Sequence, residues 1–230
     1  MKVKTILLCF GAVLLCGCEQ FYSVDISSFS QSPSLTDKTC VILSGLDKIP
    51  SSDLQFQEFK PYVQRALEHQ GYKVTEDIQK AQIEILLSYS IVGPILEGYQ
   101  ANAGDNMDSH AVFTPSTSDK PYVRMATFFY HEPEIIYTVP ANPTYIYVKT
   151  IVLEAWDARK GAKDPQGIQY WKMIINCAGR SKDLREAFPA MMAAAMDYIG
   201  SDTRRIVTVD IKESDGRILY IKGLRSTPSY

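Results

Sequence analysis

Apolar and polar residues alternate along several stretches of this chain, and the alternation predicts strands. Between Ile83 and Ile91 every second residue is isoleucine, leucine or tyrosine, which is the period of a half-buried strand. The short apolar run from Cys40 to Leu43 favours a buried strand. Residues 122–130, 144–156 and 168–177 are rich in aromatic and β-branched side chains, so three more strands are expected there.

The polar connection 157–167 lies between the last two of these strands and favours an antiparallel hairpin. In the second strand of that hairpin, the predicted core face consists of Trp171, Met173, Ile175 and Cys177. A further alternation from Val207 to Ile211 is followed by Asp215-Gly216, a dipeptide typical of tight turns. We therefore expect a C-terminal hairpin whose second strand covers residues 218–221.

Apolar residues at three- and four-residue steps predict two amphipathic helices, over 51–71 and 181–200, each with serine as the N-cap and glycine at its end. Pro61 and Pro189 lie inside these patterns, so each helix either kinks there or begins its regular part nearby. Strands outnumber helices, and short turns join most neighbours. The sequence predicts an α+β domain, a mainly antiparallel sheet with two helices on one face.

The N-terminus has the pattern of an export signal. Lys2 and Lys4 precede a short apolar run, residues 6–15, and the chain then reads Leu15-Cys16-Gly17-Cys18. A membrane-spanning helix needs roughly twenty apolar residues, so this run is too short and indicates a signal peptide over residues 1–17. An ordinary secretory signal cut nearby, or a buried start of the domain, is the alternative.

After the signal, the chain is expected to form a serine-rich linker over residues 18–37 that packs only in part, followed by a single domain over 38–230. Gly93-Pro94 is expected to end the strand that begins at Ile83. A long irregular insertion, at about 94–121, should come next. Insertions of that length are usually either functional or disordered.

Leu15 to Cys18 resembles the lipobox of bacterial lipoproteins, and the stretches AGRSKDLREAFP at 178–189 and ILLSYSIVGP at 85–94 resemble recurrent segments of uncharacterised bacterial envelope lipoproteins. That resemblance implies acyl chains on Cys18, which would anchor the mature chain in a membrane without a spanning helix. Glu19, where an aspartate would favour retention in the inner membrane, points to the outer membrane. The resemblance carries no established activity, and this chain's insertion is more acidic and less aromatic than that of the relatives.

Charge and composition are typical of a globular protein that does not bind nucleic acid. The formal charge is −2, and loss of Lys2 and Lys4 with the signal would make it −4. This mild acidity argues against a nucleic-acid partner and against an extended electrostatic membrane surface. Beyond Cys18, the folded part keeps Cys40 and Cys177, which could form a disulfide in an oxidising periplasm or stay as buried free thiols.

The usual signatures of catalysis are missing from the sequence. It has no Gly-x-Ser-x-Gly elbow, no Cys-x-x-Cys after the signal and no glycine-rich phosphate loop. The strongest metal candidates lie in two loop-like segments, and their spacing fits neither a calcium loop nor a zinc helix motif. These candidates are Asp105, Asp108, His110, His131, Glu132 and Glu134. No metal and no cofactor is expected.

Aromatic residues in the later strands are either core residues or an exposed binding surface. The surface candidates are Tyr130, Tyr137, Tyr145 and Tyr147, beside Phe128 and Phe129. We therefore expect a lipid-anchored, periplasm-facing envelope protein that is not an enzyme and holds another envelope protein or glycan through these strands and the insertion. The alternative is a small periplasmic hydrolase or metal-dependent enzyme with a non-standard site, whose residues would be spatially and not sequentially adjacent.

Overall fold

A single mixed sheet holds every strand in the described part of this computed structural model, which covers residues 21–31, 37–46, 49–96, 144–162, 164 and 166–228. The strand order is β3-β2-β4-β5-β6-β1-β7. The strands are β1 (Phe21–Ser30), β2 (Thr39–Ser44), β3 (Lys73–Val74), β4 (Ile83–Leu96), β5 (Tyr145–Asp157), β6 (Gln169–Gly179) and β7 (Val207–Lys212). β2 runs parallel to β3 and β4, whereas β6 pairs antiparallel with β5 and β1, and β1 with β7.

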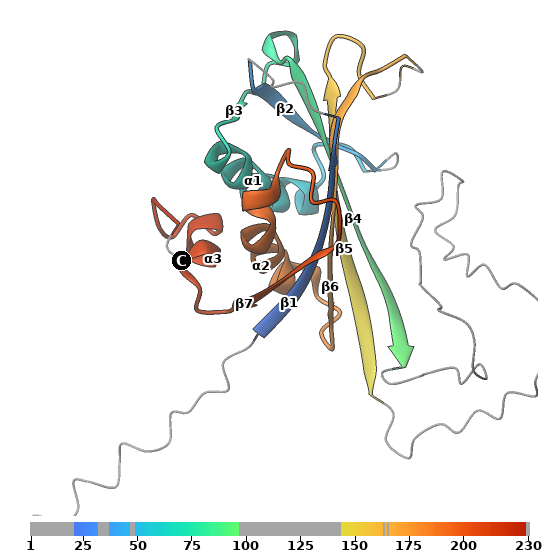
Figure 1. Ribbon diagram of the computed structural model, residues 1–230, viewed down its shortest axis with the longest axis vertical. Helices are drawn as coiled ribbons and strands as arrows, with labels where there is room; N and C mark the ends of the chain where they lie inside the picture. The colour runs from blue at the N-terminus through green and yellow to red at the C-terminus, as the bar shows by residue number, and fades with distance from the viewer. Residues whose placement is uncertain are drawn as a thin grey trace, which may run out of the picture. The chain divides into compact units, whose positions relative to one another are not determined.

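Three α-helices in the described residues lie on one face of this sheet (Figure 1). They are α1 (Leu54–His69), α2 (Leu184–Ala195) and α3 (Gly216–Ile221), and two short 3-10 turns, η1 (Ile78–Lys80) and η2 (Met196–Tyr198), accompany them. The predicted α+β class is confirmed. The caps are aspartates and not the predicted serines, since Asp53 Oδ1 accepts from Phe56 N at 3.0 Å and Asp183 Oδ1 accepts from Arg185 N at 2.8 Å.

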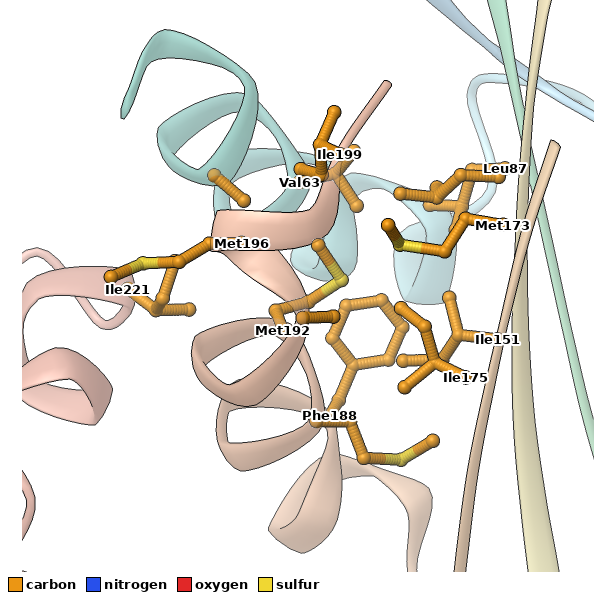
Figure 2. Packing of buried hydrophobic residues seen from close by; sticks show 14 of the residues in the cluster. Val63, Leu87, Ile151, Met173, Ile175, Phe188, Met192, Met196, Ile199 and Ile221 are labelled. Atoms are coloured by element: carbon orange, nitrogen blue, oxygen red, sulfur yellow. The ribbon is translucent and has the colours of Figure 1, made fainter. Parts of the chain in front are cut away.

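The core lies between the helices and the sheet. Phe188 of α2 stacks on Phe59 of α1 with ring centroids 4.1 Å apart, and both side chains are fully buried. Figure 2 shows Phe188 and Met192 facing Ile151 and Ile175 of the sheet. The face predicted from Trp171 to Cys177 is confirmed as a core face. Truncating a ring packed this way costs about 3–5 kcal/mol in comparable cores.

The expected linker over residues 18–37 is wrong for its described part, because residues 21–30 form β1 inside the sheet. Tyr22, Val24 and Ile26 alternate with polar residues and are buried, and β1 pairs with β6 on one side and β7 on the other. Those partners come from more than a hundred residues further along the chain, so the local sequence does not reveal them. The signal peptide and Cys18 lie outside the described residues.

The expected C-terminal hairpin is also wrong, since residues 216–221 form α3. Asp215 caps this helix by accepting from Arg217 N at 2.8 Å, and Ile218 and Ile221, three positions apart, are buried. Arg65 of α1 donates to the Ile221 carbonyl at 2.8 Å, which fixes α3 beside α1. The three-residue spacing suits a helix, and the aspartate acts as a cap in place of a turn residue.

The strand predicted from Ile83 continues past Gly93-Pro94, where it was expected to stop. Proline lacks an N–H and is tolerated in a strand where no neighbour needs that donor. The pairing of β2 with β4 ends at Ser44 opposite Leu87, so among the described residues the later half of β4 has no partner on that side. By internal packing the chain divides into one unit of Met1–Ile95 with Ile146–Tyr230 and another of Leu96–Tyr145. The predicted start of the insertion at 94 is wrong, because Pro94, Ile95 and Leu96 belong to β4. The rest of the predicted insertion and the predicted strand 122–130 lie outside the described residues.

Candidate interaction surface

Alternation along the central strands separates a helix-covered face from a second face. In β5, Ile151, Leu153 and Ala155 are buried toward the helices, while the residues between them are half-buried and point the other way. β6 has the same pattern, and its register with β5 puts equivalent positions side by side. We call the second face the outer face. Its central positions are Ser88, Ser90, Val148, Thr150, Val152, Ile174, Asn176 and Ala178.

The centre of the outer face carries no charge. Val152 lies opposite Ile174, and Thr150 Oγ1 donates to Asn176 Oδ1 at 2.8 Å, so neighbouring strands are matched apolar to apolar and polar to polar. An ion pair between Lys172 and Glu154, 2.7 Å, lies next to this centre. The three helices of the described residues all lie on the opposite face (Figure 1). The centre of the outer face is therefore an uncharged strip, bordered by Asp25, opposite Asn176, and by the Lys172–Glu154 pair. An uncharged strip of this kind is a candidate for contacts.

Two of the four predicted tyrosines lie in described residues, at the start of β5. Tyr145 is 48% exposed, whereas Tyr147 is half-buried. A Cβ on Gly93 of β4 would lie 2.9 Å from a ring carbon of Tyr147, so this glycine leaves room for the ring. Tyr130 and Tyr137 lie outside the described residues, and the tyrosine surface stays a prediction.

The end of β4 and the start of β5 form a strand pair that we call the apolar arm, residues 91–96 and 145–148. Gly93 adjoins Tyr147, and Ala158 N donates to the Gln82 carbonyl at 3.0 Å, so β4 and β5 run antiparallel. Ile91 and Ile95 are 41% and 38% exposed. No charged residue occurs from 85 to 96 or from 144 to 148.

Cys40 and Cys177 are free, buried thiols, and the structure does not pair them. Cys40 lies in β2 and Cys177 in β6, with β4 and β5 between them. Three strand spacings amount to about 14 Å, whereas a disulfide needs Cα atoms within about 7 Å. Burial raises the pKa of the Cys40 thiol to about 12. Burial also raises the pKa of Cys177, against an opposing effect of the Lys149 ammonium.

Sequence reasoning overlooked Lys149, which occupies an inward position of β5 and is only 2% exposed. The alternation that places Ile151 and Leu153 inward already assigns Lys149 to the same face, so the signal was present. Two buried polar atoms elsewhere, Tyr89 OH and Trp156 Nε1, have no hydrogen-bond partner in the described structure. Buried polar groups are normally paired, so each is a local destabilising feature.

A buried carboxylate closes the end of the β5 and β6 hairpin. Asp157 is 3% exposed, and its Oδ1 accepts from Arg159 Nε at 2.9 Å and Arg159 N at 3.0 Å. The Arg159 side chain lowers the pKa of Asp157 to about 2. The pair tightens a turn, since Gly161 N also donates to the Asp157 carbonyl at 2.8 Å. This pair was not predicted from the sequence.

The metal candidates in the two loop-like segments lie outside the described residues. Within the described ranges there is no group of three or more histidine, cysteine, aspartate or glutamate side chains placed to hold a metal ion. His69, at the end of α1, lies 3.0 Å from Asp197 Oδ1. Among the described helices, none combines the length and the apolar character that crossing a bilayer requires.

Comparison with known proteins gives distant structural neighbours only. No protein-family model matches this chain, and no curated protein matches it. A PDZ domain protein from Parabacteroides distasonis is 16% identical, with a TM-score of 0.41 over 84% of this chain and 39% of that protein. A DUF4136 family protein from Bacteroides thetaiotaomicron is 11% identical, with a TM-score of 0.34 over 76% of this chain and 95% of that protein. The chain thus spans well under half of the Parabacteroides protein, and likenesses this distant assign no function.

Proposed function

We infer that this chain is a lipid-anchored protein of the bacterial cell envelope, facing the periplasm, whose domain binds another envelope component and catalyses no reaction of its own. The observation that supports binding is the uncharged centre of the outer face, which includes Val152 and Ile174 and lies on the side opposite the described helices. Burial of half-buried apolar groups on a sheet face by a partner is favourable by about 25 cal/mol per Å² of apolar surface removed from water.

The location rests on the N-terminal sequence. Lys2 and Lys4, the apolar run and the Leu15 to Cys18 lipobox together favour export and acylation at Cys18. Two or more acyl chains give stable anchoring, where a single chain gives reversible binding. Glu19 favours the outer membrane over the inner one. The uncharacterised envelope lipoproteins that the sequence resembles support the same location.

The location is tested by intact mass and cell fractionation in a Gram-negative host, with wild type beside Cys18→Ala. The wild type should begin at Cys18, carry the added mass of acyl chains and follow outer-membrane markers. The Cys18→Ala protein should be unprocessed or released. Recovery of the wild type as a soluble periplasmic protein with an unmodified Cys18 would refute the proposal that the protein is anchored through lipid.

Binding through the outer face is tested by site-specific photocrosslinking in cells. Ser90 of β4 and Ala178 of β6 are exposed outer-face positions, and Gln55 of α1 is an exposed control on the helix side. A photoreactive residue at Ser90 or Ala178 should give a crosslinked product of discrete mass, and Gln55 should not. A Ser90→Asp change should weaken the product formed from position 178, because it places an unpaired charge in the contact. Equal products from all three positions would argue against the outer face.

A further inference from the structure

The first residue of β1 and the tip of β4 lie at the same end of the sheet. Val24 of β1 is opposite Cys177, and Tyr147 of β5 is opposite Gly179, so both Phe21 and the apolar arm lie beyond the Cys177 level. Figure 1 shows the start of β1 and the tip of β4 at the lower end of the sheet. The chain enters the domain at the end where the apolar arm also finishes.

Exposed apolar side chains gather at this end. Phe21 is 60% exposed, with the Lys212 ammonium 5.4 Å from its ring centroid, and Ile95 is 38% exposed. Strand ends and edges that face water usually carry charges, which prevent unwanted association. The apolar arm carries none. Charged neighbours at this end have both signs, with Arg180 and Lys182 against Asp183 and Glu213, so the apolar side chains and not net charge define the surface.

The proposed anchor reaches only this end. Cys18 precedes Phe21 by three residues, and an extended chain spans at most about 3.6 Å per residue, or roughly 11 Å over that distance. Acyl chains on Cys18 would place its backbone at the lipid–water interface. The start of β1 would then lie within roughly 11 Å of that interface.

We propose that this end of the sheet faces the bilayer and that Phe21 and Ile95 insert into its interfacial region. The inference rests on the proposed acylation of Cys18. Insertion removes two exposed apolar side chains from water. The lack of charge along the apolar arm means that insertion of Ile95 desolvates no ionised group of the arm, and the long Lys212 side chain beside Phe21 can keep its ammonium at the headgroup level. The outer face and the helices then stand above the membrane, accessible to a partner.

The test uses the acylated, full-length mature protein in phospholipid vesicles, with an environment-sensitive fluorophore attached at a new cysteine. The two test positions are Phe21→Cys and Ile95→Cys. The matched control is Ile168→Cys, which is 51% exposed in the connection at the opposite end of β5 and β6. Cys40 and Cys177 are buried, so labelling should occur at the introduced thiol. The quenchers are lipids with a nitroxide on the acyl chain and aqueous iodide.

Labels at positions 21 and 95 should be quenched several-fold more by the lipid nitroxide than the label at 168, which iodide should quench instead. Acylated protein in which position 95 is as open to iodide as position 168 would overturn the inference and leave the proposed function intact. Shielding of position 95 from both quenchers would show that a protein covers this end, and would also overturn it. Absence of acyl mass on Cys18 in the same sample would refute the proposed anchoring itself, and the inference with it.

Discussion

Two buried tyrosines differ in what their hydroxyl groups contact. The Tyr72 hydroxyl accepts from Trp171 Nε1 at 2.8 Å, inside the core. The Tyr89 hydroxyl is buried and has no partner in the described residues, while its ring packs edge-on against Phe59 at 5.1 Å. Burial raises the pKa of Tyr72 to about 12, and it raises that of Tyr89 too. Both hydroxyls are therefore neutral at physiological pH.

Phenylalanine at these two positions should have different effects on stability. Tyr72→Phe leaves the Trp171 N–H without its acceptor and should lower the free energy of unfolding by about 1–3 kcal/mol. Tyr89→Phe removes a hydroxyl that contributes no hydrogen bond and should leave stability unchanged or raise it. Urea unfolding followed by far-UV circular dichroism measures both, and each variant serves as the control for the other. An equal loss in both would mean that the Tyr89 hydroxyl has a partner, such as a bound water.

The thiols of Cys40 and Cys177 should remain reduced in protein purified without reductant. Using the mature Cys18→Ala form, we expect Ellman's reagent to react slowly in the folded state, because burial disfavours the thiolate. In denaturant, both thiols should titrate rapidly. If denatured, unreduced protein gave no thiol signal, the cysteines would be bridged and the strand order would have to differ.

At the scale of elements, those that depend on local residues could be predicted from the sequence. Those that depend on partners far away in the chain could not. The hairpin of β5 and β6 was predictable, because Trp171 to Cys177 alternate strictly and both strands are adjacent in the chain. β1 was not, because its serines lower its strand propensity and its partners lie far away in sequence. α3 was mistaken for a strand because Asp215-Gly216 suits a turn as well as a cap.

The Asp157–Arg159 pair makes the β5 and β6 hairpin sensitive to acid. The folded pKa of Asp157, about 2, lies below its ordinary value of 3.8, so the carboxylate stabilises the fold fully above pH 4 and loses this effect as pH falls toward 2. At pH 7, Asp157→Asn should lower the free energy of unfolding by about 1–3 kcal/mol, because a charge-assisted hydrogen bond is lost. Denaturant unfolding between pH 7 and 2 should show the two proteins converging. A constant difference down to pH 2 would contradict this assignment.

At the scale of the whole molecule, the candidate surface was predictable only in part. The aromatic run that includes Tyr145 and Tyr147 pointed to the start of β5, and the structure places both residues in the apolar arm. The outer face depends on which side of the sheet the helices cover, and no single stretch of sequence states that. Likewise, the coincidence of Phe21 and Ile95 at one end follows from the order β5-β6-β1, which is a property of the folded sheet.

The same topology predicts that the chain between β4 and β5 can be shortened without loss of the fold. Gly93 and Tyr147 are already neighbours across the two strands, so a hairpin loop of about five residues can replace residues 97–143. Shortening a connection about ninefold lowers the entropy cost of closing it, by about 2 kcal/mol if the segment behaves as a free loop.

Thermal and urea unfolding of the shortened protein should therefore give stability equal to the parent's or higher by up to about 2 kcal/mol. A matched control replaces residues 158–167, where Gly161 N and Arg159 bind Asp157, with a glycine-rich loop of equal length. That change should destabilise the hairpin, because it removes specific hydrogen bonds. Failure of the shortened protein to fold would mean that residues 97–143 belong to the structural core, and the domain would then extend beyond the sheet and helices described.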